Sequence, residues 1–166
     1  MYNPSNAEKW WPAPLVNHNL PPICWGRFPY EGPPYLKSPW DFKERPCLVL
    51  AIDEAVDLPT GRFQLIVAYG TSNASGHFDG EFFVTADTSK TGFARSDLTN
   101  PTRFNLNKLA PLYYNSDWLD IPSFKRGLKS PQIGYLDSAF LPVLKTAMKE
   151  ADVQRQMKDF DGLAPR

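Results

Sequence analysis

The stretch Arg45-Pro46-Cys47-Leu48-Val49-Leu50-Ala51-Ile52 organises the rest of this chain. Six apolar residues follow an Arg-Pro pair, and the run is too short for a free-standing helix. A short apolar run that contains β-branched residues and is bounded by turn signals is typical of a strand buried on both faces. The sequence therefore predicts a central strand that begins at a cation, Arg45.

A second central strand is predicted over residues 63–69, and it ends in Gly-Thr-Ser at residues 70–72. The polar turn between the two runs, residues 53–61, contains Pro-Thr-Gly and predicts a hairpin. In an antiparallel pair, the start of one strand lies beside the end of the next. We therefore expect Arg45 and Thr71 to lie close together in space.

Further short strands are predicted on both sides of this pair, with polar loops between them. In the first of them, Ile23 and Trp25 face one side while Cys24 and Phe28 face the other. The additional predicted strands are 23–28, 81–85, 101–106 and 132–136, and the predicted loops are 29–44, 70–80, 86–100 and 120–131.

One helix is predicted near the C-terminal end. Asp137 or Ser138 can cap it, and Pro142 lies in its first turn, where a missing backbone donor costs least. Apolar residues recur at helical spacing from Phe140 to Ala151, which predicts a helix face packed on the core.

Composition indicates a mainly β fold with an added α-helix. The chain has 166 residues, enough for one domain, and 17 prolines against 10 glycines favour short strands joined by stiff loops. We expect a small SH3-like barrel of short antiparallel strands with a C-terminal helix over residues 21–151. An N-terminal arm over residues 1–20 is expected to dock Trp10 and Trp11 on the core, and residues 152–166 are expected to form a polar, frayed tail.

Charge and cysteine content set the expected surroundings of the protein. Eighteen basic and eighteen acidic residues cancel, so a phosphate site must be a local patch. No signal peptide or stretch of transmembrane length is evident, which predicts a cytoplasmic protein without membrane association. Cys24 and Cys47 are expected to be buried, reduced thiols, because a disulfide between their strands would need an oxidising compartment.

Several classes of enzyme chemistry find no support in the sequence. The two histidines, His18 and His77, lie in polar loops without an obvious partner. No Cys/His cluster has zinc spacing, and no Walker or dinucleotide glycine motif is present. The carboxylates of residues 53–57 are more typical of a solvated hairpin tip than of a metal site. We therefore expect neither a metal nor a cofactor.

Arg45 and the hydroxyls of Thr71 and Ser72 remain as a candidate phosphate site. The guanidinium fork of arginine donates several hydrogen bonds to phosphate oxygens and can stabilise an anionic transition state. Thr71 could hold the phosphate or the attacking group. RNA carries its own nucleophile, the 2′-hydroxyl, so such a site would need no metal. The alternative is that Arg45 forms a surface ion pair with a residue such as Glu44.

The 29–44 loop is crowded with prolines and aromatic residues and also holds two lysines. Loops of this length inside compact domains are usually functional or disordered, and the rings argue against disorder. Aromatic side chains mixed with cations can stack bases and contact phosphates, which makes Lys37, Trp40 and Lys43 candidate RNA contacts. The alternative is a proline-stiffened flap that packs on its own rings.

The order of these segments resembles the MazF/PemK toxin family, over roughly residues 20–150. The final helix also lies where that family places one. The segments that carry the likeness are Ile23-Cys24-Trp25, Phe28-Pro29, Arg45-Pro46-Cys47-Leu48-Val49-Leu50, Tyr69-Gly70-Thr71-Ser72, Gly80-Glu81-Phe82-Phe83-Val84 and Pro101-Thr102-Arg103-Phe104.

The resemblance implies an SH3-like barrel that forms a homodimer and acts as the toxin of a type II toxin–antitoxin system, with an antitoxin protein as partner. Such toxins are sequence-selective endoribonucleases that cleave single-stranded RNA without a metal, through a cyclic phosphate. The family's usual catalytic pair corresponds here to Arg45 and Thr71, with Ser72 next in line. Arg103 and Arg95 are candidates for the remaining acid/base helper.

A second hypothesis keeps the fold without the catalysis. The protein would then be a non-catalytic SH3-like module that binds a protein partner and inhibits or regulates it, which the neutral charge and the aromatic loop favour. RNA binding should weaken steeply with added salt, whereas an apolar protein interface should not. A third hypothesis is a structural domain in which Arg45 is merely paired.

Overall fold

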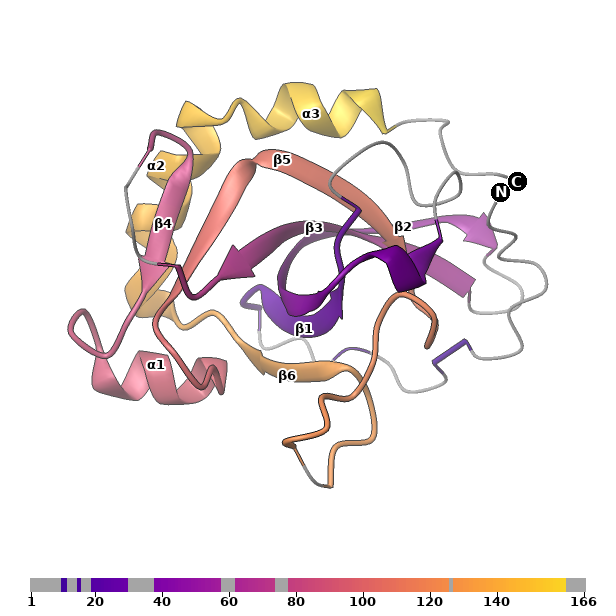
Figure 1. Ribbon diagram of the computed structural model, residues 1–166. Helices are drawn as coiled ribbons and strands as arrows, with labels where there is room; N and C mark the ends of the chain where they lie inside the picture. The colour runs from indigo at the N-terminus through magenta and orange to yellow at the C-terminus, as the bar shows by residue number, and fades with distance from the viewer. Residues whose placement is uncertain are drawn as a thin grey trace.

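The chain forms a mainly β fold with helices at one side of a curled sheet (Figure 1). This computed structural model describes residues 10–11, 15, 19–29, 38–57, 62–73, 78–125 and 127–160. In the described part of the chain, neighbouring strands pair antiparallel in a six-stranded sheet of order β4-β5-β3-β2-β1-β6. The expected class, short antiparallel strands curled into a partial barrel with a C-terminal helix, is confirmed.

The strands follow the predicted order along the chain. The strands are β1 (Pro22–Arg27), β2 (Glu44–Asp57), β3 (Arg62–Thr71), β4 (Glu81–Val84), β5 (Thr102–Tyr113) and β6 (Gln132–Tyr135). The helices are η3 (Pro39–Asp41), α1 (Lys90–Ser96), η5 (Ser138–Phe140), α2 (Leu141–Glu150) and α3 (Val153–Asp159).

The two central strands pair as the sequence predicts, in a register that includes Cys47 opposite Tyr69 and Val49 opposite Val67. β2 is longer than expected, because it continues to Asp57 through residues predicted to be a turn. Backbone hydrogen bonds to β3 do not require apolar side chains. A boundary predicted from the polarity of the side chains therefore fell too early. The turn residues 58–61 lie outside the described part of the chain.

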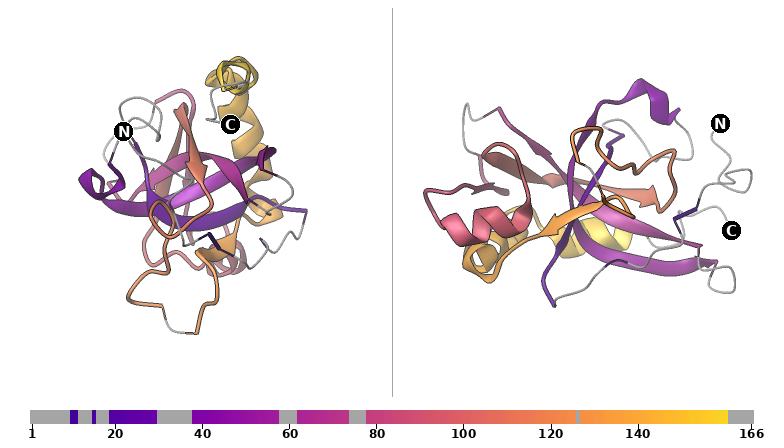
Figure 2. Two further views of the ribbon diagram at one scale, coloured as in Figure 1. Left: turned by 90° about the vertical axis from the view of Figure 1, so that its right-hand side faces the viewer. Right: turned by 90° about the horizontal axis from the view of Figure 1, so that it is seen from below.

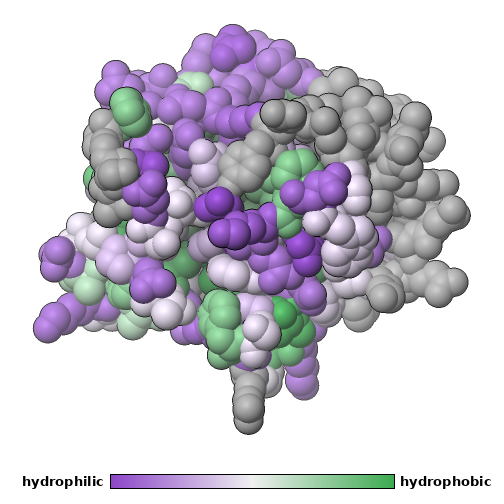
Figure 3. Space-filling model, viewed as in Figure 1, coloured by the Kyte–Doolittle hydropathy of each residue, from purple (hydrophilic) through white to green (hydrophobic). Residues whose placement is uncertain are grey.

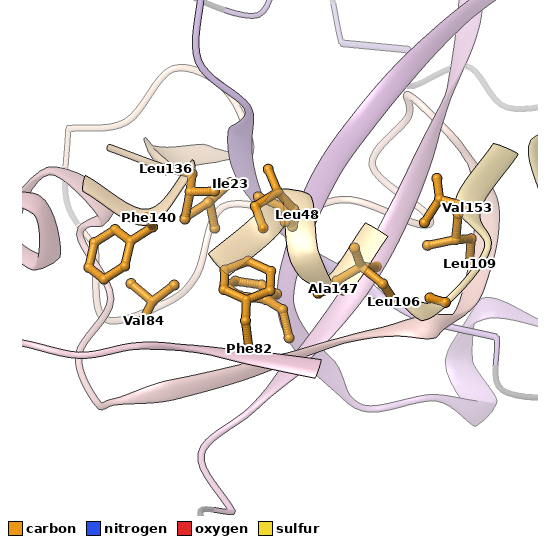
Figure 4. Packing of buried hydrophobic residues seen from close by; sticks show 14 of the residues in the cluster. Ile23, Leu48, Phe82, Val84, Leu106, Leu109, Leu136, Phe140, Ala147 and Val153 are labelled. Atoms are coloured by element: carbon orange, nitrogen blue, oxygen red, sulfur yellow. The ribbon is translucent and has the colours of Figure 1, made fainter. Parts of the chain in front are cut away.

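Each face of the sheet carries its own hydrophobic core. On one face, strand residues pack against η5, α2 and α3, and we call this group the helix-side core (Figures 2 and 4). Figure 4 shows Phe82 and Ile23 gathered with Phe140 and Ala147 of the helical region. Alternation along the strands sends every second side chain into this core. Its labelled members are Ile23, Leu48, Phe82, Val84, Leu106, Leu109, Leu136, Phe140, Ala147 and Val153.

The opposite face carries a second group, the tryptophan-side core, which includes Cys24, Cys47 and Trp118. The predicted docking of the N-terminal tryptophans occurs here. Trp10 forms an isolated β-bridge with Asn115, and the indole N–H of Trp11 donates to the carbonyl oxygen of Leu119 at 2.9 Å. Both tryptophans therefore close this face of the sheet.

The prediction that residues 86–100 form a loop is wrong, because α1 forms within this segment. Ser89 caps the helix by accepting a hydrogen bond from the backbone N–H of Gly92 at 3.0 Å. Asp97 ends it in the left-handed conformation, with φ of 56°. Phe93 supplies the contact with the helix-side core. A helix of seven residues, about two turns, with a glycine inside has too little apolar periodicity to be recognised from the sequence.

The expected frayed tail is also wrong over residues 153–159, which form α3. The side chain of Gln156, 9% exposed, accepts from the backbone N–H of Leu109 at 3.1 Å and donates to the carbonyl oxygen of Leu106 at 2.8 Å. These are backbone groups of β5 beyond the end of its pairing with β4. The side-chain amide of Gln156 therefore provides the hydrogen-bond partners that these backbone groups of β5 would otherwise lack.

Within the described part of the chain, no helix combines the length and apolar character needed to cross a lipid bilayer.

Candidate functional site

A pocket of about 450 Å³ lies at the start of β2, the end of β3 and the start of β5. Such a volume is within the range of ligand sites in proteins, roughly 300–1,000 Å³. The segment after α1, residues 97–100, lines it, and so does Phe124 from the loop between β5 and β6. That loop projects from the body of the molecule (Figures 1 and 2).

Arg45 and Thr71 both line this pocket, as their positions in the two strands predict. The pairing of β2 with β3 ends at Cys47 opposite Tyr69, and Arg45 and Thr71 each lie two residues beyond this pair. Thr71 is itself opposite Arg103 in the pairing of β3 with β5. The sheet thus places Arg45, Thr71 and Arg103 in one row across three strands, which we call the cationic row.

Alternation along the strands assigns the cationic row to a face of the sheet. Arg45 shares the face of Cys47, and Thr71 shares the face of Tyr69. Burial raises the pKa of the Cys47 thiol to about 12, and the nearby charge of Arg45 opposes that rise. Pro46 lies on the other face, in the pocket wall. Of the row, Arg45 and Thr71 line the pocket, whereas Arg103 lies outside the lining.

The polar side chains of the pocket can make hydrogen bonds to a bound molecule. Thr71 Oγ1 accepts from the backbone N–H of Asn73 at 3.2 Å, which leaves its hydroxyl hydrogen directed elsewhere. Ser72, beside it, is exposed. Hydroxyl and amide groups also come from Thr99, Asn100 and Thr102 in the pocket wall.

The charges of the pocket are two cations, Lys43 and Arg45, and two carboxylates, Glu44 and Asp97. Glu44 Oε1 pairs with Arg27 Nη2 at 3.1 Å, and its Oε2 accepts from the indole N–H of Trp25 at 2.9 Å. Asp97 Oδ2 pairs with Lys125 Nζ at 2.9 Å. Each pocket carboxylate is thus paired with a cation from outside the lining.

These contacts bear on the alternative of an Arg45–Glu44 ion pair. Neighbouring residues of a strand project to opposite faces, and the carboxylate of Glu44 pairs with Arg27.

The predicted RNA contacts are placed differently from one another. Lys43 is exposed and lines the pocket. Trp40 is outside the lining, 64% exposed, with the guanidinium carbon of Arg27 4.8 Å from its ring centroid. Lys37 lies outside the described residues.

The two candidate helpers have carboxylate partners. Arg103 Nε pairs with Glu81 Oε2 at 3.2 Å, and both side chains are largely buried. Arg95 Nη1 donates to Asp137 Oδ1 at 2.6 Å, which holds the pKa of Asp137 below its usual range. Arg95 is at the end of α1, so this bond anchors the helix that leads into residues 97–100.

Several lining residues were missed by sequence reasoning, chiefly residues 97–100 and Phe124. They lie in segments read as undifferentiated loops, and only the folded chain brings them to Arg45. Figure 3 shows hydrophobic side chains on the projecting loop among largely hydrophilic surroundings. That contrast depends on exposure, which the sequence does not report.

No protein-family model matches the sequence, and a search of curated proteins found no match.

Proposed function

We propose that the protein is a metal-independent, sequence-selective endoribonuclease that cleaves single-stranded RNA at the rim where Arg45 and Thr71 meet. The observation that carries this proposal is that both residues line one pocket, together with hydroxyls, an exposed lysine and two aromatic rings. This combination can hold a phosphate beside a base, which is what a single RNA strand presents.

The proposed reaction uses the nucleophile of the substrate. The 2′-oxygen attacks the adjacent phosphorus, and the bond from phosphorus to the 5′-oxygen breaks. The products are a 2′,3′-cyclic phosphate and a 5′-hydroxyl; the 2′-hydroxyl loses its proton and the leaving 5′-oxygen gains one. The protein's task is to align these groups and to stabilise the charge that develops on the phosphate.

In this mechanism, Arg45 stabilises the negative charge that develops on the phosphate. Its guanidinium group can donate two hydrogen bonds to the non-bridging oxygens, which carry more negative charge in the transition state than in the substrate. Thr71 is assigned to positioning, because its hydroxyl hydrogen can be donated to a phosphate oxygen while Asn73 occupies its acceptor side. Ser72 is the next hydroxyl along the rim.

The biological role proposed with this chemistry is that of a toxin restrained by an antitoxin protein, acting as a homodimer. Degradation of messenger RNA would arrest growth, and an antitoxin would act by covering the Arg45 rim. Expression of the chain alone, compared with its Arg45→Ala variant, tests this role through the growth rate of the host culture.

The decisive experiment is cleavage of long single-stranded RNA by purified protein in EDTA. The variants are Arg45→Ala and, as a matched control, Arg155→Ala on the exposed side of α3, where the arginine pairs with Asp152 and Asp159. We expect discrete fragments with 5′-hydroxyl ends from the wild type and the control, and none from Arg45→Ala. Equal thermal melting of the three proteins shows that the fold is intact; intact RNA with all three would overturn the proposal.

A second candidate function, a non-catalytic binding module, is favoured by one observation. The described lining includes no histidine, and both of its carboxylates are paired with cations. A site without a group poised to take a proton suits binding better than cleavage. The same assay separates the two: RNA that is bound but never cut supports the module on nucleic acid, and absence of RNA binding directs attention to a protein partner.

A further inference from the structure

A chain of contacts runs along one wall of the pocket and joins two aromatic rings that are far apart in the sequence. At one end, the guanidinium carbon of Arg27 lies 4.8 Å from the ring centroid of Trp40. Arg27 pairs with Glu44 at 3.1 Å, and Glu44 accepts from the indole N–H of Trp25 at 2.9 Å. Trp25 in turn meets Phe124 edge to face, with centroids 5.3 Å apart at 89°.

Both terminal rings of this chain are open to solvent. Trp40 is 64% exposed and Phe124 is 56% exposed. Large rings usually lie in cores or interfaces, because they remove much apolar area from water when covered. Each ring also has a cation close by: Arg27 lies over Trp40, and Lys125 Nζ is 6.0 Å from the centroid of Phe124. Ring and cation together are the pattern of a surface that stacks bases along a phosphate backbone.

The loop that carries Phe124 is anchored rather than loosely attached. The backbone N–H of Asp120 donates to the carbonyl oxygen of Trp25 at 2.9 Å, and the N–H of Trp25 donates to the carbonyl oxygen of Pro131 at 2.9 Å. The two ends of the loop are therefore fastened to one residue of β1, whose ring also touches Phe124. A ring held in place before binding loses less conformational entropy when a ligand arrives.

We propose that Phe124 and Trp40 are stacking platforms for two bases of one RNA strand, one inside the pocket and one beyond its rim. The inference rests on the RNA substrate of the proposed function and adds the elements that set its register. Phe124 lines the pocket and Trp40 does not, so the two bases occupy different environments. Arg27, Glu44 and Trp25 fix the separation of the platforms.

The two sites differ in what they read. A base on Trp40 meets a ring and solvent, so stacking there is indifferent to base identity. A base on Phe124 enters a pocket whose walls carry the amide of Asn100 and the hydroxyl of Thr99, both of them exposed residues. Those groups can hydrogen-bond to base edges, so sequence selection belongs to the Phe124 site.

The test measures binding apart from cleavage. A fluorescently labelled RNA with 2′-fluoro groups cannot be cut, because it lacks the attacking hydroxyl, and its anisotropy reports the dissociation constant. The variants are Trp40→Leu and Phe124→Leu, with Phe78→Leu as the matched control, since Phe78 is 65% exposed and outside the lining. Each platform variant should bind about 5- to 100-fold more weakly, and the control should bind like the wild type.

Base removal and salt dependence identify the interaction. An abasic position scanned along the oligonucleotide should weaken wild-type binding at two positions, and each Leu variant should lose its sensitivity at one of them. The slope of the logarithm of the binding constant against the logarithm of salt concentration should not change in the Leu variants, because neither substitution removes a contact with phosphate.

The outcomes separate this inference from the proposed function. If both Leu variants bind as tightly as the wild type while the wild type still cleaves natural RNA, the proposed base stacking on Trp40 and Phe124 is wrong. The proposed endoribonuclease activity is then still supported. If the wild type binds no oligonucleotide and cleaves none, both fail, and the exposed rings belong to a protein interface. Loss confined to the two platform variants supports the inference whether or not cleavage is observed.

Discussion

Thr71 of β3 lies directly opposite Arg103 of β5, and Arg103 in turn pairs with Glu81 of β4 at 3.2 Å. A residue proposed to hold phosphate thus has a cation as its cross-strand neighbour. The cation is fixed from its far side by a carboxylate that is only 6% exposed. Glu81 accordingly acts as a positioning residue, which holds Arg103 in the sheet.

Replacing Glu81 by Gln should destabilise the protein, because the largely buried ion pair between Glu81 and Arg103 would be lost. Removing one partner of a buried ion pair typically lowers the free energy of unfolding by about 3–5 kcal/mol. We expect the lower end of this range, because the Arg103 side chain keeps some contact with solvent. The free energy of unfolding in urea measures the loss. The double variant Glu81→Gln/Arg103→Gln should recover part of it; strictly additive losses would show that the pair is not coupled.

Replacing Gln156 by Leu should lower the free energy of unfolding by about 1–3 kcal/mol, because buried backbone groups of Leu106 and Leu109 would lose their partners. Gln154→Leu on the exposed side of α3 is the matched control and should leave stability nearly unchanged. Urea denaturation followed by circular dichroism measures both. Equal stability of the two variants would mean that water replaces the amide at β5.

The thiols of Cys24 and Cys47 should be inert in the folded protein, because both are fully buried and burial raises the pKa of each. A thiol-specific colour reagent should react only after urea is added. Fast reaction of the native protein would contradict the burial of these residues.

The same thiols predict how stability depends on alkaline pH. A group whose pKa is raised in the folded state stabilises fully below its unfolded value, here near 9.0, and loses that contribution as pH rises toward the folded value. Above about pH 9, each thiol should therefore lower stability by up to about 1.4 kcal/mol per pH unit. Cys24→Ala should show a shallower alkaline loss than the wild type; identical slopes would contradict the assignment.

Replacing Arg95 by Ala should raise the pKa of Asp137, because the hydrogen bond from Arg95 is the main cause of its depression. The carboxyl stabilises the fold above its unfolded pKa and loses this contribution as pH falls through its lower folded pKa. In the variant this contribution should be smaller, and its loss should be complete at a higher pH. Carbon-detected NMR titration of Asp137 checks the shift; an unchanged pKa would assign the depression to the backbone N–H of Ala139 instead.

The sheet could be predicted because its signals are local. Apolar runs around Leu48 and Val67 set two strands, turn residues separated them, and antiparallel pairing then placed Arg45 near Thr71. The helices α1 and α3 could not, because each is a short element whose stability comes from tertiary contacts. The Ser89 cap and the Gln156 amide act on partners that become visible only in the folded chain.

The candidate site divides in the same way. Arg45 and Thr71 were found because strand order alone brings them together. Phe124 and residues 97–100 reach the pocket through loops, whose paths depend on anchoring bonds such as those of Trp25. Sequence periodicity carries no information on such bonds.

The pocket wall draws on residues from Trp25 to Ile133, and hence on five of the six strands and four loop segments. No contiguous fragment of modest length contains it. Contacts between residues so distant in sequence form late in folding, after the loops between them have closed. Ligand affinity is consequently a readout of the complete native state. A bound ligand should slow hydrogen exchange throughout the central sheet rather than only beside Arg45.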